Sequence, residues 1–351
     1  MRPDVLRILV IRLSSMGDII LTTPALTALK AHYPRVQLDF VVKERYAELF
    51  QGHPHVDNLL PLSQRDGLLS MGCRLRRQHH HIVLDLHANL RSRALTAILP
   101  APRKLRYRKR TIRRWAMVRL GYRPQESPHV VDLYLRSLRP LGIEPSGRRP
   151  RLYLLESERE FQKQFYLRHR LGDARPVVGL HPGARWPGKR WPEERFIQLG
   201  QRLREERRAQ ILVFGGAGEE DLGARVAQGL EPDAPMALNL TLRQLMALIS
   251  GCALFITNDS GPMHMATALE VPVVAIFGPT QPSLGFWPLG AEDAVLTAQL
   301  TCSPCSLHGE KRCPQGNWLC LKRIGVQDVL QAALGILDRR RKAIEKNNRP
   351  V

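Results

Sequence analysis

The strongest constraint on the fold of this chain is a repeated pattern in which a short apolar run ends in a polar turn and a helix-like segment follows. The first example is "RILVIRLSSMGDIILTTPAL", residues 7–26, where Ser-Ser-Met-Gly-Asp separates strand-like from helix-like residues. Strand-like runs recur at residues 36–43 and 81–86, with helical stretches between and after them. This alternation predicts a parallel sheet with helices on both faces.

The same pattern starts again in the second half of the chain. It follows residues 141–152, which are rich in Gly, Pro and Arg and show no periodicity. Its strand-then-turn segments are "PVVGLHPG", "AQILVFGG", "CALFITND" and "VPVVAIFGPT". We therefore expect an α/β chain with two Rossmann-like, doubly wound domains, and a ligand site where the carboxyl ends of their strands face a central cleft.

The expected domain boundaries follow from these two series. They are residues 1–150 for the first domain, 151–175 for a connecting segment, 176–324 for the second domain, and 325–351 for a basic C-terminal helix, for which packing back on the first domain is one option.

The net charge of +21 is unevenly distributed along the chain. Residues 1–150 contain 27 Lys and Arg against 11 Asp and Glu, a net charge of +16, whereas residues 151–351 contain 26 against 21, a net charge of +5. No acid lies between Asp85 and Glu126, a stretch that carries twelve cations. This excess indicates an anionic partner, such as nucleic acid, anionic lipid or a phosphorylated substrate.

No targeting or membrane-spanning segment is expected. The first apolar run is interrupted by Arg7 and Arg12 and lacks a small-residue cleavage site. The other apolar runs are of strand length, far short of the ~20 apolar residues that a membrane-spanning helix needs. The sequence therefore favours a cytoplasmic protein.

The turn in "TNDSGPMHMATALE" is a candidate phosphate site. A strand ends near Asp259, and Ser260 and Gly261 open a helix whose N–H groups and partial positive charge suit a diphosphate. Asp259 and Ser260 could instead only cap the helix. His264, one turn further on, could contact a phosphate or could pack in the core.

Two further turns strengthen the prediction of a nucleotide site. The turn "HPGARWPGKRWP" contains His181 and Gly183, and its Lys189 supplies a point charge for phosphate unless it is simply solvated. The turn "VFGGAGEEDL" lacks the full G-x-G-x-x-G spacing, but its Glu219 or Glu220 could accept hydrogen bonds from a ribose.

Three segments together resemble the ADP-heptose:lipopolysaccharide heptosyltransferases of glycosyltransferase family 9. They are "VIRLSSMGDIILTTPAL", "GKRWPEERF" and "NDSGPMHMATALEVPVVAIFGPT", in the order and at the spacing of that family. The resemblance implies a GT-B fold, with the acceptor on the N-terminal domain and the ADP-sugar on the C-terminal one. It also implies transfer with inversion at the anomeric carbon and no metal requirement for that transfer.

The resemblance also implies roles for individual residues. Asp18 falls on the aspartate of the family's S-x-G-D motif, the general base, and Lys189 falls on its phosphate-binding lysine. Asp259 falls on the nucleotide-contacting aspartate, near the diphosphate. The remaining candidates for contact with the nucleotide-sugar are Ser14, Ser15, Gly17, His181, Gly183, Glu219, Glu220, Ser260, Gly261 and His264.

The chemistry of inverting transfer explains why a carboxylate is needed at residue 18. A base must take the proton from the acceptor hydroxyl while that oxygen attacks C1 from the face opposite the leaving ADP. A helix N-terminus keeps Asp18 ionised, although it also makes the carboxylate a weaker base. Positive charge at Lys189 and at neighbouring amides would stabilise the departing diphosphate.

The basic stretch supplies the candidates for acceptor binding. The resemblance matches the family's N-terminal cations, which hold the phosphorylated inner core of lipid A, only in general character. The candidate residues are Arg91, Arg93, Arg106 and Arg108. A lipid-linked acceptor also implies peripheral contact with the cytoplasmic face of the inner membrane.

Four cysteines lie within nineteen residues, at Cys302, Cys305, Cys313 and Cys320. A C-x2-C pair followed by two further thiols could hold a structural zinc ion. The second pair does not have C-x2-C spacing, so reduced thiols or two disulfides are alternatives.

The leading hypothesis is a transferase that moves heptose from ADP-heptose to the inner core of lipopolysaccharide. The alternatives are a GT-B transferase for another nucleotide-sugar or acceptor, and a non-catalytic protein that binds nucleic acid or anionic lipid. Nucleic acid is disfavoured because the cations lack a recognisable pattern of interleaved stacking aromatic residues.

Overall fold

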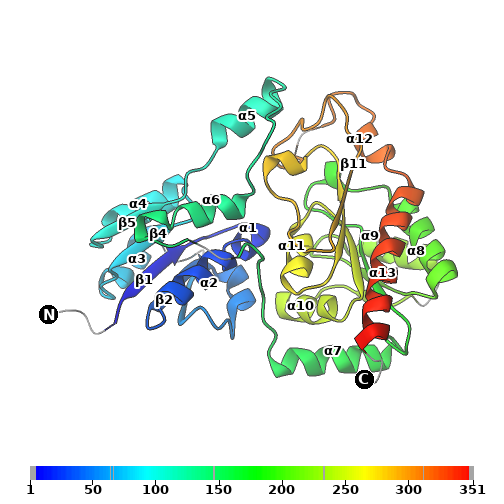
Figure 1. Cartoon of the computed structure of the whole chain (residues 1–351), viewed down its shortest axis with the longest axis horizontal. Helices are drawn as coiled ribbons and strands as arrows, with labels where there is room; N and C mark the ends of the chain where they lie inside the picture. The colour runs from blue at the N-terminus through cyan, green and yellow to red at the C-terminus, as the bar shows by residue number, and fades with distance from the viewer. Residues whose placement is uncertain are drawn as a thin grey trace. The chain divides into compact units, whose positions relative to one another are not determined.

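The computed structural model describes residues 5–63, 65, 67–144, 147–231, 234–310 and 312–347, which form two compact units (Figure 1). The first unit comprises residues 1–111 and 128–153, and the second comprises residues 112–127 and 154–351. Each unit contains one parallel sheet, as the alternating pattern predicts.

The first unit has a five-stranded sheet in the order β3-β2-β1-β4-β5. Its central strand is buried on both faces, because Leu9 and Ile11 join a core with α3 and α4 while the alternate residues Ile8 and Val10 are also shielded from water. The elements of this unit are β1 (Arg7–Ile11), α1 (Met16–Ile20), α2 (Thr23–His32), β2 (Gln37–Lys43), β3 (Asn58–Leu62), α3 (Leu68–Arg76), β4 (Ile82–Asp85), α4 (Leu90–Ile98), β5 (Arg103–Arg106) and α6 (Val130–Arg136), with 3₁₀ turns at Glu44–Phe50 and Arg139–Leu141.

The second unit has a six-stranded sheet in the order β11-β10-β9-β6-β7-β8. Its core joins strand residues such as Leu180 and Ile256 to Phe196 of α8 and Leu330 of α13. The elements are α5 (Thr111–Arg119), α7 (Glu156–Arg168), β6 (Val177–His181), α8 (Glu193–Arg207), β7 (Gln210–Phe214), α9 (Glu220–Leu230), β8 (Met236–Ala237), α10 (Leu242–Ser250), β9 (Leu254–Asn258), α11 (Gly261–Ala268), β10 (Val273–Phe277), β11 (Ala294–Thr297), α12 (Leu319–Lys322) and α13 (Val326–Asn347), with 3₁₀ turns at Pro187–Lys189 and Pro282–Leu284.

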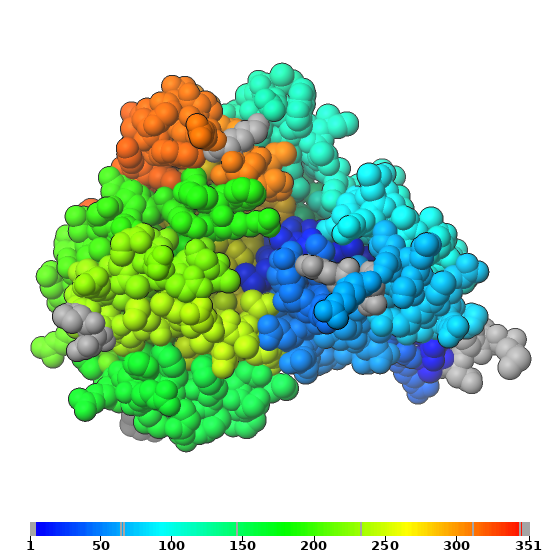
Figure 2. Space-filling model, turned by 180° about the vertical axis from the view of Figure 1, so that it is seen from behind, coloured from blue at the N-terminus to red at the C-terminus, as the bar shows by residue number. Residues whose placement is uncertain are grey.

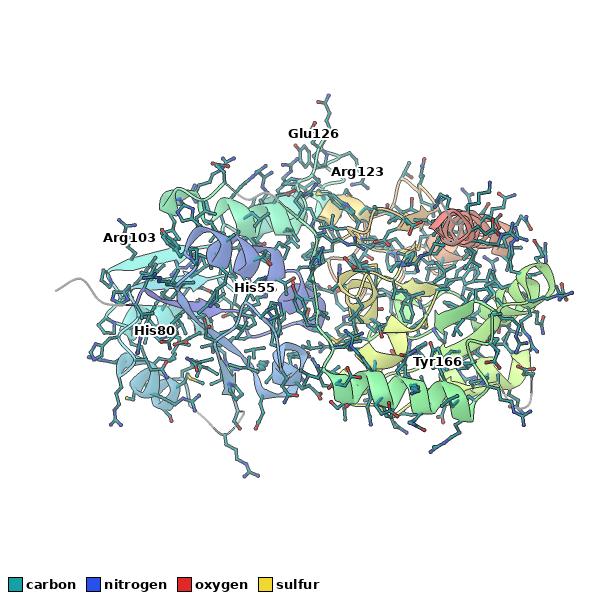
Figure 3. All side chains as sticks on the ribbon, turned by 60° about the horizontal axis from the view of Figure 1, so that its bottom comes forward. His55, His80, Arg103, Arg123, Glu126 and Tyr166 are labelled. Atoms are coloured by element: carbon teal, nitrogen blue, oxygen red, sulfur yellow. The ribbon has the colours of Figure 1, made fainter. Side chains whose placement is uncertain are left out.

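The unit boundaries differ from the expected ones. Residues 112–127 belong with the second unit although they lie within the stretch assigned to the first. The expected connecting segment contains α7, which packs against α10: Tyr166 (labelled in Figure 3) donates a hydrogen bond of 3.4 Å to the Leu248 carbonyl, and Glu158 pairs with Arg243 at 2.8 Å. This segment is therefore part of the second unit.

The C-terminal helix also belongs to the second unit. The apolar face of α13, including Val329, Leu330, Ala333 and Ile336, is fully buried in the core of that unit. Within its own unit the helix contacts α8 and strands β9, β10 and β11, and packing on the first domain stays one option. Its apolar stripe explains this placement, because burial there removes the whole stripe from water.

Strand register brings the candidate site residues to one edge of each sheet. In the first sheet Ile11 pairs with Asp85, and Asp85 pairs with Arg106. In the second sheet His181 pairs with Thr257, and Asn258 pairs with Ile276. The turns that follow these strands therefore lie at the carboxyl edge of their own sheet, where α/β proteins bind ligands.

Two glycines of the second unit test the packing by substitutions that change stability in opposite directions. In Gly179→Ala the new Cβ would lie 2.6 Å from the Phe255 ring and 2.9 Å from the Phe214 ring, so we expect destabilisation by about 1–3 kcal/mol. In Gly335→Ala the nearest atom is 3.5 Å away, at the end of the Arg339 side chain, and helix propensity should stabilise α13 by up to about 1 kcal/mol. Urea unfolding followed by tryptophan fluorescence measures the free energy of unfolding of each variant. An equal change in the two variants would contradict the tight packing of β6.

Candidate active site

Asp18 lies in the first turn of α1, directly after strand β1 and its connecting loop. Its Oδ2 accepts hydrogen bonds from the Ser15 hydroxyl at 2.7 Å and from the Ser15 N–H at 3.2 Å. Its side chain keeps 23 % of its exposure, so the carboxylate remains accessible. The turn thus caps the helix and at the same time presents Asp18 at the sheet edge.

The other oxygen of this carboxylate is held by Arg12. Arg12 Nη2 lies 2.8 Å from Asp18 Oδ1, and Arg12 Nη1 donates to the Leu86 carbonyl at 2.6 Å. The guanidinium also lies over the ring of Tyr134. Burial alone would lower the pKa of Arg12, but the charge of Asp18 raises it, so the guanidinium stays charged beside the carboxylate.

In the sequence, Arg12 interrupts the first apolar run, and no partner was predicted for it. A cation inside a buried strand segment needs a partner, because an unpaired buried charge is costly. The position of Arg12 in an apolar segment could therefore have predicted a nearby acidic partner such as Asp18. Ser14 and Gly17 flank the pair, with Gly17 buried and Ser14 partly exposed.

Several cations of the first unit line one open cavity of about 610 Å³ beside this edge. Its lining residues are Ala88, Arg93, Arg106, Tyr107, Arg108, Lys109 and Thr111. Three of the four predicted acceptor contacts therefore line one cavity, whereas Arg91 is not among its lining residues. Lys109 is a further lining residue that the sequence analysis did not single out.

Asp85 holds two parts of the chain that border this cavity. It is fully buried and accepts hydrogen bonds from the Ser92 hydroxyl and from the N–H groups of His87 and Ala88. Arg106 Nε lies 3.4 Å from the same carboxylate. A buried carboxylate thus fixes both the loop after β4 and a cation that lines the cavity.

In the second unit, Lys189 and Asp259 form an ion pair at the carboxyl edge of the sheet. Lys189 Nζ lies 2.6 Å from Asp259 Oδ2 and 3.3 Å from the Asp259 carbonyl oxygen. Thr280, in the turn that follows the neighbouring strand β10, donates a hydrogen bond of 2.7 Å to the same Oδ2. Two of the three N–H donors of the ammonium group go to Asp259, which leaves the third for an anionic ligand.

The pair lies at the start of α11. Ser260 is the N-cap residue, and its hydroxyl lies 3.2 Å from that of Thr257. Gly261 begins the helix, whose first N–H groups follow directly on Asp259. His264 is only 5 % exposed, and its neighbours from Pro262 to Ala268 are buried with it.

Glu219 and His181 form a second polar pair at this edge. His181 Nε2 lies 3.2 Å from Glu219 Oε2, while its Nδ1 lies 3.2 Å from the Thr257 hydroxyl. Burial would raise the pKa of Glu219, but the His181 contact and the Gly216 N–H lower it. Gly183 lets this carboxylate approach the backbone, because a Cβ at that position would lie 2.1 Å from Glu219 Oε2 and would displace it.

Glu220 occupies a different position from Glu219. Glu219 is the N-cap residue of α9 and its carboxylate reaches the β6 turn, whereas Glu220 is the first residue of the helix. A ribose contact stays a prediction for both residues, and His181 and the Gly216 N–H already engage one oxygen of Glu219.

Asn258 fixes the loop that carries Lys189. Its buried side chain donates to the carbonyls of Pro182 and Gly183 and accepts from the Trp191 N–H at 3.0 Å. Neither Asn258 nor Thr280 was predicted from the sequence to belong to this site. A polar residue that ends a fully buried strand requires partners, which is the signal that Asn258 offered.

The cysteine-rich segment packs against Lys189. A Cβ at Gly309, which has a φ of +85°, would lie 2.6 Å from Cγ of Lys189. A Cβ at Gly188 would lie 2.5 Å from the ring of Trp318. Residues 309 and 318 therefore support the aliphatic part of the lysine and the turn that bears it.

The four clustered cysteines share one small cavity of about 40 Å³. All four are free thiols, and burial together with the neighbouring thiols raises the pKa of Cys320 to about 11. Among the residues that the structure describes, no group of three or more His, Cys, Asp or Glu is arranged to hold a metal ion. The structural zinc ion therefore stays a prediction, and no step of the mechanism depends on it.

A buried histidine at the Asp18 edge should give stability a defined pH dependence. Burial, together with the charges of Arg12 and Lys109, lowers the pKa of His87 to about 4. Between pH 6.5 and 4 the unfolded chain therefore binds a proton that the folded chain does not, so stability falls as the pH falls through this range. From pH 7.5 to pH 5 we expect His87 to account for about 2 kcal/mol of the loss.

His87→Asn measures this contribution, with the exposed His32→Asn as the matched control. Urea unfolding followed by circular dichroism at pH 7.5 and pH 5 gives the pH-dependent loss for each variant. The loss should shrink in His87→Asn and stay unchanged in His32→Asn. An unchanged loss in both variants would show that His87 takes up its proton equally well in the folded chain.

No helix among the described residues is long and apolar enough to cross a bilayer. Comparison with known proteins gives three kinds of finding: related sequences, solved structures and a family model. The chain is 30 % identical over 320 residues to lipopolysaccharide heptosyltransferase 1 of Pseudomonas aeruginosa, covering 86 % of each chain. It is 28 % identical over 298 residues to lipopolysaccharide heptosyltransferase 2 of Escherichia coli K12, covering 79 % of this chain and 84 % of that protein.

Two solved structures share the whole architecture. A glycosyl transferase family 9 protein from Veillonella parvula has a TM-score of 0.81 at 27 % identity, covering 97 % of this chain and 99 % of that one. The ADP-heptose lps heptosyltransferase II of E. coli has a TM-score of 0.74 at 25 % identity, covering 96 % and 100 %. These matches confirm the predicted GT-B fold.

The family model described as "Glycosyltransferase family 9 (heptosyltransferase)" matches residues 68–318, which is most of the chain. That match includes the Lys189–Asp259 pair and three of the four clustered cysteines, while Cys320 lies after it and the Asp18 turn lies before it. The chain therefore belongs to glycosyltransferase family 9, the heptosyltransferase family, and is a glycosyltransferase.

Proposed function

We propose that this enzyme transfers L-glycero-D-manno-heptose from ADP-heptose to the inner core of lipopolysaccharide, with inversion at the anomeric carbon. The single observation that carries the proposal is the Lys189–Asp259 pair, which holds an ammonium group at the N-terminus of α11. Family membership and the names of the relatives support heptose as the sugar and lipopolysaccharide as the acceptor.

The donor diphosphate binds at the edge of the second sheet. The remaining N–H of Lys189 donates to a diphosphate oxygen, and the first amides of α11 add partial positive charge. Ser260 and Gly261 lie at these amides, and His264 packs behind them. Glu219, positioned by His181 above Gly183, accepts a hydrogen bond from the ribose.

Asp18 acts as the general base. The acceptor hydroxyl gives its proton to the Asp18 carboxylate as its oxygen attacks C1 of the heptose. The new bond joins the acceptor oxygen to C1, and the bond from C1 to the diphosphate oxygen breaks on the opposite face. The electron pair of the broken bond leaves with ADP.

The environment of Asp18 determines how the catalytic work is divided. Arg12 and Ser15 stabilise the carboxylate, which keeps it ionised but makes proton uptake less favourable. Stabilisation of the departing diphosphate by Lys189 therefore contributes the larger part of the rate enhancement, as electrostatic stabilisation does in many enzymes. The transfer itself uses no metal ion.

The acceptor binds through the cations of the first unit. Arg93, Arg106, Arg108 and Lys109 line one cavity, and this arrangement suits a phosphorylated or carboxylated sugar. A GT-B transferase for a different nucleotide-sugar or acceptor is the alternative, and the Lys189–Asp259 pair alone would serve either. Assays with ADP-heptose against other nucleotide-sugars separate the two.

Asp18→Asn tests the base directly. The amide keeps the shape of the side chain but cannot take the proton, so we expect kcat to fall about 10²–10⁴-fold. The Kd for ADP, measured by calorimetry in the presence of EDTA, should stay within about two-fold of the wild type, because ADP is proposed to bind the second unit. A folded variant that transfers heptose at the wild-type rate would refute the assignment.

A pair of glycines tests the support of Lys189 by the cysteine-rich segment. Gly309→Ala places a methyl group against the lysine stem and should weaken ADP binding by about ten-fold, equivalent to roughly 1.4 kcal/mol. Gly316→Ala is the matched control, since Gly316 also has a positive φ, of +68°, but no atom within 4 Å of the new methyl group. An equal loss of ADP affinity in the two variants, relative to the wild type, would show that backbone strain causes the loss. Unchanged affinity in both would show that residue 309 does not support Lys189.

A further inference from the structure

The cysteine-rich segment carries four thiols that the proposed transfer reaction does not use. Cys302, Cys305, Cys313 and Cys320, which we call the thiol cluster, all line the cavity of about 40 Å³, and all four are reduced. Figure 2 shows the orange residues near position 310, which include part of this segment, at the surface of the second unit. The thiol cluster is therefore a compact group of nucleophilic side chains close to solvent.

Cys313 differs from the other members of the thiol cluster in its hydrogen bonds. The Trp318 N–H donates to Cys313 Sγ at 3.4 Å. Burial would raise the pKa of Cys313, but this N–H and the backbone N–H groups of residues 315–317 lower it. In contrast, burial and the neighbouring thiols raise the pKa of Cys320 to about 11. Because the thiolate is the reactive form of cysteine, Cys313 is the nucleophile of the cluster.

Cys313 is also open to small reagents. It is half-buried, and residues 314–317, which follow it, are exposed. Cys320, by comparison, is only 6 % exposed. A small molecule can therefore meet Cys313 from solvent, while the other thiols of the cluster are at hand behind it in the same cavity.

Trp318 connects Cys313 to the turn that carries Lys189. Its N–H donates to Cys313 Sγ, and a Cβ at Gly188, directly before Lys189, would lie 2.5 Å from its ring. Gly309 of the same segment packs against the stem of Lys189, where a Cβ would lie 2.6 Å from Cγ. A change at Cys313 Sγ is thus one residue away from the support of the lysine proposed to hold the donor diphosphate.

A metal ion is the other occupant that four clustered cysteines suggest. In the part of the chain that the structure describes, no group of three or more His, Cys, Asp or Glu side chains is arranged to hold one. The geometry therefore favours a reactive thiol over a metal centre, and the metal content of the protein becomes an outcome of the test.

We propose that Cys313 is a reversible modification site that reacts with small disulfides, and that its modification weakens donor binding. The Cys313 thiolate attacks one sulfur of the disulfide and forms a new S–S bond, while the old S–S bond breaks and its electron pair leaves with the other half as a thiolate. A second thiol of the cluster loses its proton to water and displaces the attached half in the same way. Two protein thiols are then oxidised to one disulfide, and the small disulfide is reduced to two thiols.

This inference deepens the proposed function, on which it rests for the role of Lys189 in binding the donor. Either the attached group or the internal disulfide removes the contact of Cys313 Sγ with the Trp318 N–H. The Trp318 ring then no longer holds Gly188, so the Lys189 ammonium group loses its fixed position at Asp259. The donor site would therefore respond to the thiol–disulfide balance of its surroundings.

The first test measures where oxidised glutathione reacts on the full chain. The reduced wild type is treated at pH 6.5, quenched with an alkylating reagent and mapped by mass spectrometry. Cys313 should react about ten-fold faster than Cys73, because the N–H donors favour its thiolate. Cys73 is the matched control, since it is an exposed thiol on α3 of the first unit. Equal rates at the two residues would overturn the assignment of Cys313 as the reactive thiol.

The second test measures ADP affinity by calorimetry before and after this treatment. The Kd of the wild type for ADP should rise about ten-fold on modification and should return to its first value after dithiothreitol. Cys313→Ser should keep the same Kd with and without oxidised glutathione, whereas Cys73→Ser should respond as the wild type does. The recovery in dithiothreitol needs no variant, so it tests the proposal even if Cys313→Ser does not fold.

Three results would contradict parts of this account in different ways. An ADP affinity that complete modification of Cys313 leaves unchanged would overturn this inference alone. A stoichiometric metal ion in the purified protein, whose removal is needed before Cys313 reacts, would assign the thiol cluster to a metal centre and would also overturn it. Failure of the reduced wild type to bind ADP would refute the donor site of the proposed function instead.

Discussion

Parallel strand pairing is the constraint on which both candidate sites depend. In each sheet the strands run in one direction, so the residues that follow them gather at one edge. Asp85 and Arg106 meet at the edge of the first sheet because they are register partners. Asp259 and Thr280 meet at the edge of the second because their strands are neighbours. Distant parts of the sequence thereby supply one set of polar groups at each edge.

Charge pairing at these edges sets the chemistry that each unit can perform. Asp18 is held by a buried arginine, and Lys189 is held by an aspartate that also accepts from Thr280. Such pairing fixes the position of each group before a substrate arrives, so that little reorganisation is needed during the reaction. Because Arg12 and Ser15 stabilise the carboxylate, they also oppose proton uptake by Asp18. More of the proposed rate enhancement therefore comes from stabilisation of the departing diphosphate.

The central strands and the turns after them could be predicted from the sequence, because buried parallel strands read as continuous apolar runs. The edge strands could not. Strand β5 is "RKLR", β8 is two residues long, β3 contains Pro61, and β11 is only half-buried. None of them forms the apolar run that signals a central strand.

Long-range contacts explain the remaining differences between prediction and structure. The assignment of residues 112–127 to the second unit depends on Arg114 and Arg123, whose partners lie more than 170 positions away. A charge and an amide within strand-like segments signal that Arg12 and Asn258 need partners. Only the structure shows that these partners are Asp18 and the loop that carries Lys189. Gly309 could not be linked to Lys189 by any local pattern.

The most direct test of the account is the release of ADP from ADP-heptose, measured with and without a lipopolysaccharide acceptor that lacks inner-core heptose. The product acceptor is analysed by mass spectrometry and its new linkage by NMR. The account predicts release that depends on the acceptor, a product heavier by one heptose, and an anomeric configuration opposite to that of the donor. Release that is independent of the acceptor, or a product with the donor's configuration, would contradict it.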